Sequence, residues 1–262
     1  MVEKIQTNQI TNYFIIISYL IITIIVPLIC TAFNAIIVII IFYSTLFILG
    51  ILWYWRGGNS ILRKNKIKLV EGENCKELQN IIFDLKKELR LNVCIKIGIL
   101  DDALPNAFTL FLAPRKYSII LSVGIFENLD NNEIKAVIAH ELFHIKNRDV
   151  WVKALFIIGR FISFPMGPFI ESYVSRSREI HADIQSSKFT KDPLSLASAL
   201  LKIIKCYNTN SKLDFQVANV SKSFWIINYS KRKNDNIIRK LLSRHPPIEK
   251  RVKKLMLYKI KD

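Results

Sequence analysis

Two histidines separated by three residues could bind a metal ion within the stretch AVIAHELFHIKNRDV, residues 136–150. His140 and His144 stand four positions apart, so both rings lie on one face of a helix and can reach the same tetrahedral ion. Glu141 follows the first histidine and can take a proton from a metal-bound water. Zinc lowers the pKa of such a water to about 7, so a carboxylate is a sufficient base at neutral pH. The pattern therefore predicts one zinc ion per chain, held by His140 and His144.

A third protein ligand must come from elsewhere in the chain. The spacing HExxHxxGxxH is excluded, because the chain lacks the required glycine and third histidine. The segment SRSREIHAD, residues 175–183, offers Glu179 and Asp183 four positions apart, again on one helix face. Glu179 can complete the ligand set, and Asp183 can accept a hydrogen bond from the far nitrogen of a ligand histidine. The alternative is a solvated acidic face, and His181 could be a packed or exposed imidazole without a role.

Several elements must position these residues. Asp130 and Glu133 have the spacing of a capping box and open the helix that carries the two histidines. Apolar spacing predicts a further helix over Glu73–Leu91. Three runs rich in β-branched and aromatic residues read as strands, namely Val93–Leu100, Ala107–Leu112 and Tyr117–Val123. We therefore expect an α+β fold, a mainly helical zinc-binding domain with a small three-stranded sheet.

The N-terminal part of the chain is predicted to lie in a membrane. Residues 5–55 contain no charged side chain, and Tyr13–Trp55 is almost continuously apolar. A membrane-spanning helix needs about 20 apolar residues, so this run is too long for one span and about right for two. We place the reversal at Cys30–Asn34. Basic residues flank the hairpin on both sides and belong in the cytoplasm. Residues 1–55 are thus expected to form a membrane anchor of two transmembrane helices, and residues 56–262 a cytoplasmic domain that carries the zinc site.

Composition agrees with a multi-pass protein of the plasma membrane. The formal net charge is +17, yet 51% of the residues are hydrophobic, a combination typical of membrane proteins with a basic cytoplasmic face. Nucleic-acid binding is the competing explanation of the charge, but no recognition motif accompanies it. We therefore predict the lipid bilayer as a partner and no nucleic acid. The four cysteines have neither disulfide nor metal-ligand spacing, so nitrogen and oxygen atoms should hold the zinc.

Three blocks of the sequence resemble the membrane zinc metalloproteases of the HtpX and CaaX-prenyl-protease group. They are the run from Pro105 to Asp149, the segment SRSREIHAD and the C-terminal HPPIEKR, residues 245–251, and they occur in the family's order. The resemblance implies that residues 56–262 are a zinc metallopeptidase (zinc metalloprotease) domain. It also implies that His140, His144 and Glu179 bind the zinc and that Glu141 is the base.

The resemblance also suggests roles for further residues. Asn106 and Ala107 lead into an edge strand that lines the substrate cleft, where Asn106 could bond the substrate backbone or be only a turn-forming residue. His245 precedes two prolines and reads as a helix start; by analogy with the family it could also donate to the oxyanion. Asp149 is expected to be a structural partner of the motif helix.

The apolar composition of residues 151–170 is compatible with a third membrane span. Zinc ligands must share one compartment, and only 34 residues lie between His144 and Glu179. Two crossings need about 40 residues, and a single crossing would separate the ligands. We therefore predict that residues 151–170 form a helix or hairpin that packs on the domain or enters the interface. This departs from the four spans usual among HtpX-like members.

The expected activity is hydrolysis of peptide bonds in membrane or membrane-proximal, misfolded polypeptides. One alternative is the processing of lipidated C-termini, and another is a metal-bearing membrane scaffold or sensor without catalysis. The natural substrate and the oligomeric state do not follow from the sequence.

Overall fold

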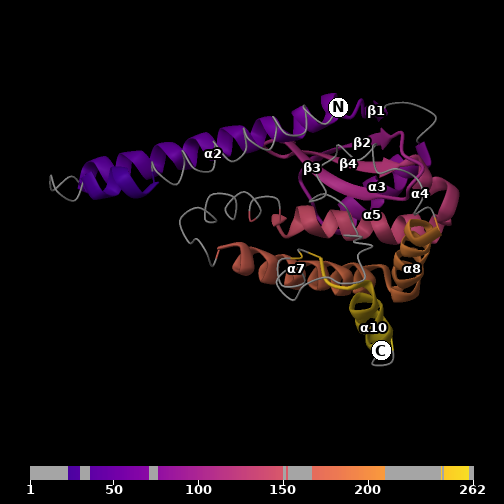
Figure 1. Cartoon of the computed structure of the whole chain (residues 1–262). Coiled ribbons are helices and arrows are strands. Elements are labelled where there is room, and N and C mark those ends of the chain that lie inside the picture. Colours follow the sequence, from indigo (N-terminus) through magenta and orange to yellow (C-terminus); the bar gives the residue numbers. More distant parts are fainter. Residues whose placement is uncertain are drawn as a thin grey trace.

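The prediction of a mainly helical α+β fold is confirmed. The computed structural model describes residues 23–29, 36–70, 76–149, 152, 167–209, 243 and 245–259. Its elements (Figure 1) are α2 (Ile36–Lys64), β1 (Lys68–Val70), α3 (Lys76–Glu88), β2 (Cys94–Leu100), β3 (Ala107–Ala113), β4 (Lys116–Ser122), α4 (Val123–Asn128), α5 (Asn131–Lys146), α7 (Gly167–Thr190), α8 (Pro193–Thr209) and α10 (Ile248–Lys259).

The sheet has four strands in the order β1-β2-β4-β3, so the prediction of three strands was wrong. The missed strand, β1, is only Lys68–Val70 and pairs antiparallel with β2. Its residues are largely exposed, so they show no apolar alternation, and pairing with β2 alone makes them a strand. The three predicted strands are present, and no end is shifted by more than one residue. Strands β2 and β4 run parallel, whereas β3 pairs antiparallel with β4.

Strand β4 lies in the middle of the sheet and is buried on both faces. Every residue from Tyr117 to Ser122 is buried, as expected for a strand covered on both sides. Ile119 and Leu121 join the large core with α5, whereas Ile120 points to a second core. That second core also contains Leu62 of α2. The sheet therefore lies between the C-terminal part of α2 and the helices α3 and α5, with α7 beyond α5 (Figure 1).

Helix α5 begins with the predicted capping box. The side chain of Asp130 accepts hydrogen bonds from the backbone N–H groups of Asn132 and Glu133, and the Glu133 carboxylate accepts from the Asp130 N–H at 3.0 Å. Glu133 also accepts from Ser198 and Lys202 of α8, at 2.6 and 2.7 Å. The start of α5 is thereby fixed to a second helix, which sets the position of the histidines further along it.

Much of the predicted membrane hairpin lies outside the described residues, including residues 1–22 and the reversal at 30–34. So does most of the segment 151–170. Helix α2 runs continuously past residue 55, where the sequence placed the domain boundary. Among the residues that the structure describes, no helix is both long and apolar enough to cross a bilayer. The part of α2 up to Leu52 nevertheless exposes large apolar side chains, namely Ile36, Ile37, Val38, Ile40, Ile41, Phe47, Ile48, Leu49 and Leu52.

The C-terminal half of α2 packs closely on strand β3. A Cβ atom at Gly58 would lie 1.9 Å from the carbonyl oxygen of Phe111. One residue later, the Asn59 side-chain amide donates to the carbonyl oxygen of Leu112 at 3.2 Å. Only glycine allows this close approach of helix and strand backbones. The apolar helix and the edge strand β3 are therefore held as one unit.

We predict that Gly58→Ala destabilises the protein by about 1–3 kcal/mol, because the new methyl group must push α2 away from β3. Gly57→Ala is the matched control, since a Cβ there meets nothing within 4 Å. Alanine in an open helical position should stabilise the fold by up to about 1 kcal/mol. Thermal unfolding of both variants in detergent measures the difference. Equal stabilisation by the two substitutions would contradict the packing of α2 on β3.

Candidate metal centre

The two motif histidines lie side by side on a buried face of α5. His140 is 0% exposed and His144 is 7% exposed. Their Nε2 atoms are 3.1 Å apart, and the rings stand at 90° to each other. One turn of helix separates them, which is why the local sequence is sufficient to bring the two nitrogen atoms together.

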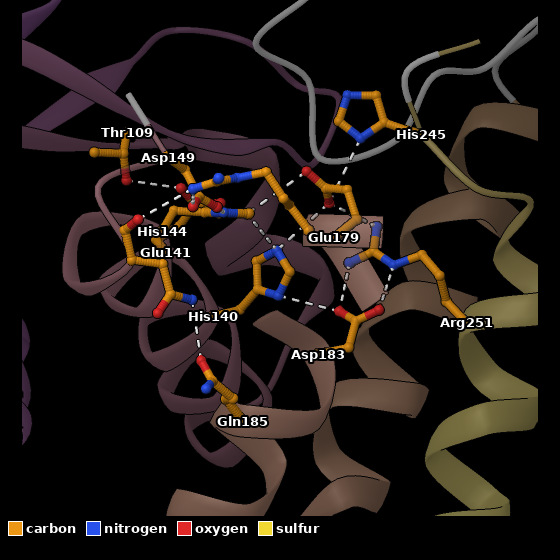
Figure 2. A network of polar contacts seen from close by, with 12 residues as sticks. Thr109, His140, Glu141, His144, Asp149, Glu179, Asp183, Gln185, His245 and Arg251 are labelled. Carbon is orange, nitrogen blue, oxygen red and sulfur yellow. Dashed lines mark hydrogen bonds and ion pairs between the residues drawn. The ribbon is translucent and has the colours of Figure 1, made fainter. Parts of the chain in front are cut away.

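Glu179 reaches the same point from α7, which packs along α5 (Figures 1 and 2). Its Oε2 lies 3.7 Å from Nε2 of His140, and its Oε1 lies 3.6 Å from Nε2 of His144. The carboxylate is buried, with Glu179 5% exposed. The three candidate ligands predicted from sequence thus converge from two helices.

The spacing of these donor atoms fits a tetrahedral zinc ion. Bonds of about 2.1 Å in tetrahedral geometry place ligand atoms roughly 3.4 Å apart. The two Nε2 atoms are 3.1 Å apart, and each has a different oxygen of Glu179 beside it, at 3.7 and 3.6 Å. Oε2 of Glu179 is also buried, and its nearest nitrogen atoms among the described residues, on His245, Arg251 and His140, lie 3.5, 3.6 and 3.7 Å away. A divalent cation would give this oxygen the close partner that a buried carboxylate requires. The residues present therefore fit a divalent metal.

Glu141 lies close enough to the two histidines to be a metal ligand as well. One oxygen of Glu141 and one ring nitrogen of each histidine lie within 4.8 Å of one another. However, Oε2 of Glu141 accepts a hydrogen bond from the hydroxyl of Thr109 on β3, at 2.7 Å, whereas Glu179 faces both rings. We therefore treat Glu179 as the third candidate ligand and Glu141 as the candidate base.

Each histidine has a carboxylate beside its far nitrogen. Oδ1 of Asp183 lies 3.1 Å from Nδ1 of His140, and Oδ2 of Asp149 lies 2.5 Å from Nδ1 of His144. A carboxylate at Nδ1 favours the proton there and leaves the Nε2 lone pair for a metal. The sequence suggested this contact for Asp183. For Asp149 it suggested only a partner of the motif helix, and the structure shows that this partner is the ring of His144 itself.

Two arginines balance these aspartates. Arg251 of α10 is 1% exposed and donates through Nε and Nη2 to the two oxygens of Asp183, each at 2.7 Å (Figure 2). Arg178 pairs with Asp149. Burial alone would raise the pKa of Asp183, but the charge and hydrogen bonds of Arg251 outweigh burial and hold the pKa below its ordinary value.

The electrostatic environment of His140 also favours a cation. Burial by itself lowers the pKa of this imidazole, but hydrogen bonds to Asp183 and Glu179 outweigh it and raise the pKa to about 9. The same carboxylates would stabilise a metal at Nε2, and a metal would bind by displacing a proton.

The structure also places the other residues considered in the sequence, one of which lies beside the candidate ligands. Nδ1 of His245 is 3.5 Å from Oε2 of Glu179, so His245 belongs to the same cluster. Ala107 begins β3 and Asn106 directly precedes it; both are buried, at 0% and 2% exposure. The backbone N–H of Asn106 donates to the Ser122 hydroxyl at 2.7 Å. His181 is exposed on α7, away from the buried face that carries Glu179.

Three residues of the cluster were not identified from sequence: Thr109, Arg178 and Arg251. Arg251 ends the HPPIEKR block, so its place in a recognisable segment was a usable signal. Thr109 is a single polar residue within the apolar strand AFTLFLA, which marks it as unusual without indicating its partner.

Comparison with known proteins identifies the family to which this chain is similar. Residues 76–167 and 162–258 match the sequence pattern of peptidase family M48. A "Protease HtpX homolog" of Salinibacter ruber is 31% identical over 229 residues, which cover 77% of this chain and 81% of the relative. The homologue of Dictyoglomus turgidum is 30% identical over 198 residues, covering 62% and 63%. The crystal structure of S. mikatae Ste24p matches with a TM-score of 0.59 at 18% identity, over 97% of this chain and 67% of that one, which indicates a shared fold.

We predict that Arg251→Met destabilises the protein by about 3–5 kcal/mol, because it leaves the Asp183 carboxylate buried without its cation. Lys253→Met on the same helix is the control, since Lys253 is exposed; it should change stability by less than about 0.5 kcal/mol. Thermal unfolding and bound metal per chain are measured for both. A stable Arg251→Met variant with a full metal content would show that Asp183 does not depend on this arginine.

Proposed function

The chain belongs to peptidase family M48 as an HtpX-like member, and from this premise we propose that it is a zinc-dependent endopeptidase. The family is metal-dependent, and the buried His-Glu-His group could hold the metal. The observation that carries the proposal is the approach of the Glu179 carboxylate to both histidine rings. The two Nε2 atoms are 3.1 Å apart, and the two oxygens of Glu179 lie 3.7 Å from that of His140 and 3.6 Å from that of His144, close to the spacing of ligands around one tetrahedral zinc ion.

Each residue of the cluster is assigned a separate step. Zinc at this position would act as a Lewis acid that acidifies water and polarises the scissile carbonyl. Glu141 accepts the proton of the attacking water and passes it to the leaving amine. Asp183 and Asp149 orient the two imidazoles. We assign to His245 the donation of a hydrogen bond to the developing oxyanion, an assignment supported by its 3.5 Å approach to Glu179.

The proposed substrate is an extended polypeptide that adds to the sheet beside β3. Strand β3 lies at the end of the strand order, and an extended peptide can pair with such an edge through backbone hydrogen bonds. Ala107 begins this strand and Asn106 directly precedes it; we propose that both contact the substrate at the start of the strand. Membrane or membrane-proximal polypeptides, misfolded ones in particular, are the proposed targets, which corresponds to a role in protein quality control.

We predict that Glu141→Gln lowers the rate of peptide hydrolysis by about 10²–10⁴-fold, because the amide cannot take a proton. Zinc per chain should be unchanged, whereas Glu179→Ala should lose zinc. The assay uses the detergent-solubilised full chain with casein and an unfolded membrane protein. Equal cleavage by the wild type and Glu141→Gln would remove the peptidase assignment, and full zinc occupancy in Glu179→Ala would remove the third ligand.

We also propose that the chain is anchored in the plasma membrane, with the catalytic residues on the cytoplasmic side. The exposed apolar side chains in the part of α2 up to Leu52 support this, because contiguous apolar surface of this extent is unfavourable in water. The basic residues that follow, Arg56, Arg63, Lys64 and Lys66, support the orientation.

We expect the protein to remain in the membrane fraction after extraction with alkaline carbonate, which removes peripheral proteins. Release into the soluble fraction would contradict the anchor. Labelling of Cys94, which is exposed in the described domain, in intact cells with a membrane-impermeant thiol reagent tests the orientation. Labelling only after lysis is the expected result.

A further inference from the structure

The carboxylate of Glu141 is held by a residue from the edge strand. The hydroxyl of Thr109 donates to Oε2 of Glu141 at 2.7 Å, between residues 32 positions apart (Figure 2). Within the described part of the chain, no other hydrogen bond to this carboxylate is found. Glu141 is 4% exposed. A buried carboxylate with a fixed donor on one oxygen keeps the other oxygen in a defined direction.

The polar side chain of Thr109 is otherwise out of place in β3. Its neighbours Phe108 and Leu110 point into the core on the α2 side of the sheet, and Ala107 and Phe111 point into the core on the α5 side. Because side chains alternate along a strand, Thr109 faces α5, where Glu141 lies. A valine at this position would serve the packing equally well, so the hydroxyl needs another explanation.

The ladder between β3 and β4 shows where the backbone of Thr109 points. The N–H of Ser122 donates to the carbonyl oxygen of Asn106 at 2.9 Å, which makes residues 106 and 122 a hydrogen-bonded pair. Such pairs alternate along an antiparallel ladder. Thr109 stands opposite Ile119, three positions further along, and is therefore in a non-hydrogen-bonded pair. Its backbone N–H and C=O are directed away from β4.

The pairing of β4 with β2 agrees with this assignment. The N–H of Cys94 donates to the carbonyl oxygen of Arg115 at 2.8 Å. Odd-numbered residues along β4, Ile119 included, therefore turn their backbone groups toward β2 and not toward Thr109. Thr109 thus presents its backbone to the outer edge of β3 and its hydroxyl to Glu141.

We propose that Thr109 is a positioning residue that fixes the catalytic base and links it to the substrate-binding edge. The proposal rests on the proposed peptidase function. A substrate strand that pairs with the backbone of Thr109 would fix the position of that residue. The hydroxyl of the same residue orients Glu141, so the scissile bond and the base are aligned by one residue. Oε2 is occupied by the hydroxyl, which leaves Oε1 to take the proton from water.

The test compares Thr109→Val and Thr109→Ala, which lack the hydroxyl, with Thr109→Ser, which keeps it. In the zinc-loaded, detergent-solubilised full chain, Val and Ala should lower kcat on fluorescent casein at least about tenfold, with KM within about twofold and zinc at one per chain. Ser should restore kcat to within about threefold of the wild type. Thr190→Val on α7 is the control, because it removes a threonine hydroxyl that bonds only backbone carbonyls, those of Ser186 and Ser187.

A second readout is independent of activity. In metal-depleted protein, Thr109→Val should lower the unfolding temperature when Glu141 is present and leave it unchanged in a Glu141→Ala background, because the two residues interact directly. Additive effects in this cycle, wild-type kcat in Val, or a Ser variant as impaired as Val would each overturn the proposal. If the wild type itself does not hydrolyse peptides, the proposed function fails, whereas the cycle still decides whether Thr109 holds Glu141.

Discussion

The concentration of negative charge around two imidazoles is the constraint on which the rest of this structure depends. Four buried carboxylates surround the ring nitrogens, namely Glu141, Asp149, Glu179 and Asp183. Two guanidinium groups face them, those of Arg178 and Arg251. Four negative charges against two positive ones leave a formal charge of −2, which one divalent cation neutralises. Uncompensated charge is very costly in a protein interior, so this arrangement is understandable as a metal site.

The two arginines explain why elements far apart in sequence must meet here. Arg251 lies on the last described helix, and its fork to Asp183 joins α10 to α7. Asp183 in turn lies against His140 on α5. A geometry of this kind leaves little freedom to the imidazole, because each group in the chain is fixed by the next. The C-terminal helix is therefore part of the metal centre although it supplies no candidate ligand.

The sheet contributes on the opposite side of the cluster. Strand β3 carries Thr109 to Glu141, and its other face packs on Leu62 of α2. The close approach at Gly58 holds α2 and β3 together. The proposed substrate edge, the proposed base and the apolar helix α2 are thus mechanically connected. In a membrane-anchored peptidase, this connection would hold the site of cleavage at a constant distance from the anchor.

The sequence by itself determined the features that depend on neighbours along the chain. The HExxH spacing placed two nitrogen atoms on one helix turn, the capping box set the start of α5, and the three longer strands followed from apolar runs. Residue spacing also selected Glu179 and Asp183 as a pair. Such patterns are readable because helix and strand periods fix which side chains share a face.

Only the tertiary structure decided which distant groups meet. Glu179 of α7 faces both rings of α5. Arg251 of α10 reaches Asp183 of α7, and Thr109 of β3 reaches Glu141 of α5, so these are contacts between separate elements. Strand β1 likewise exists only because β2 offers it a partner. A local pattern carries no information on these contacts, because they depend on how whole helices and strands pack, and packing is set by the sum of many buried surfaces.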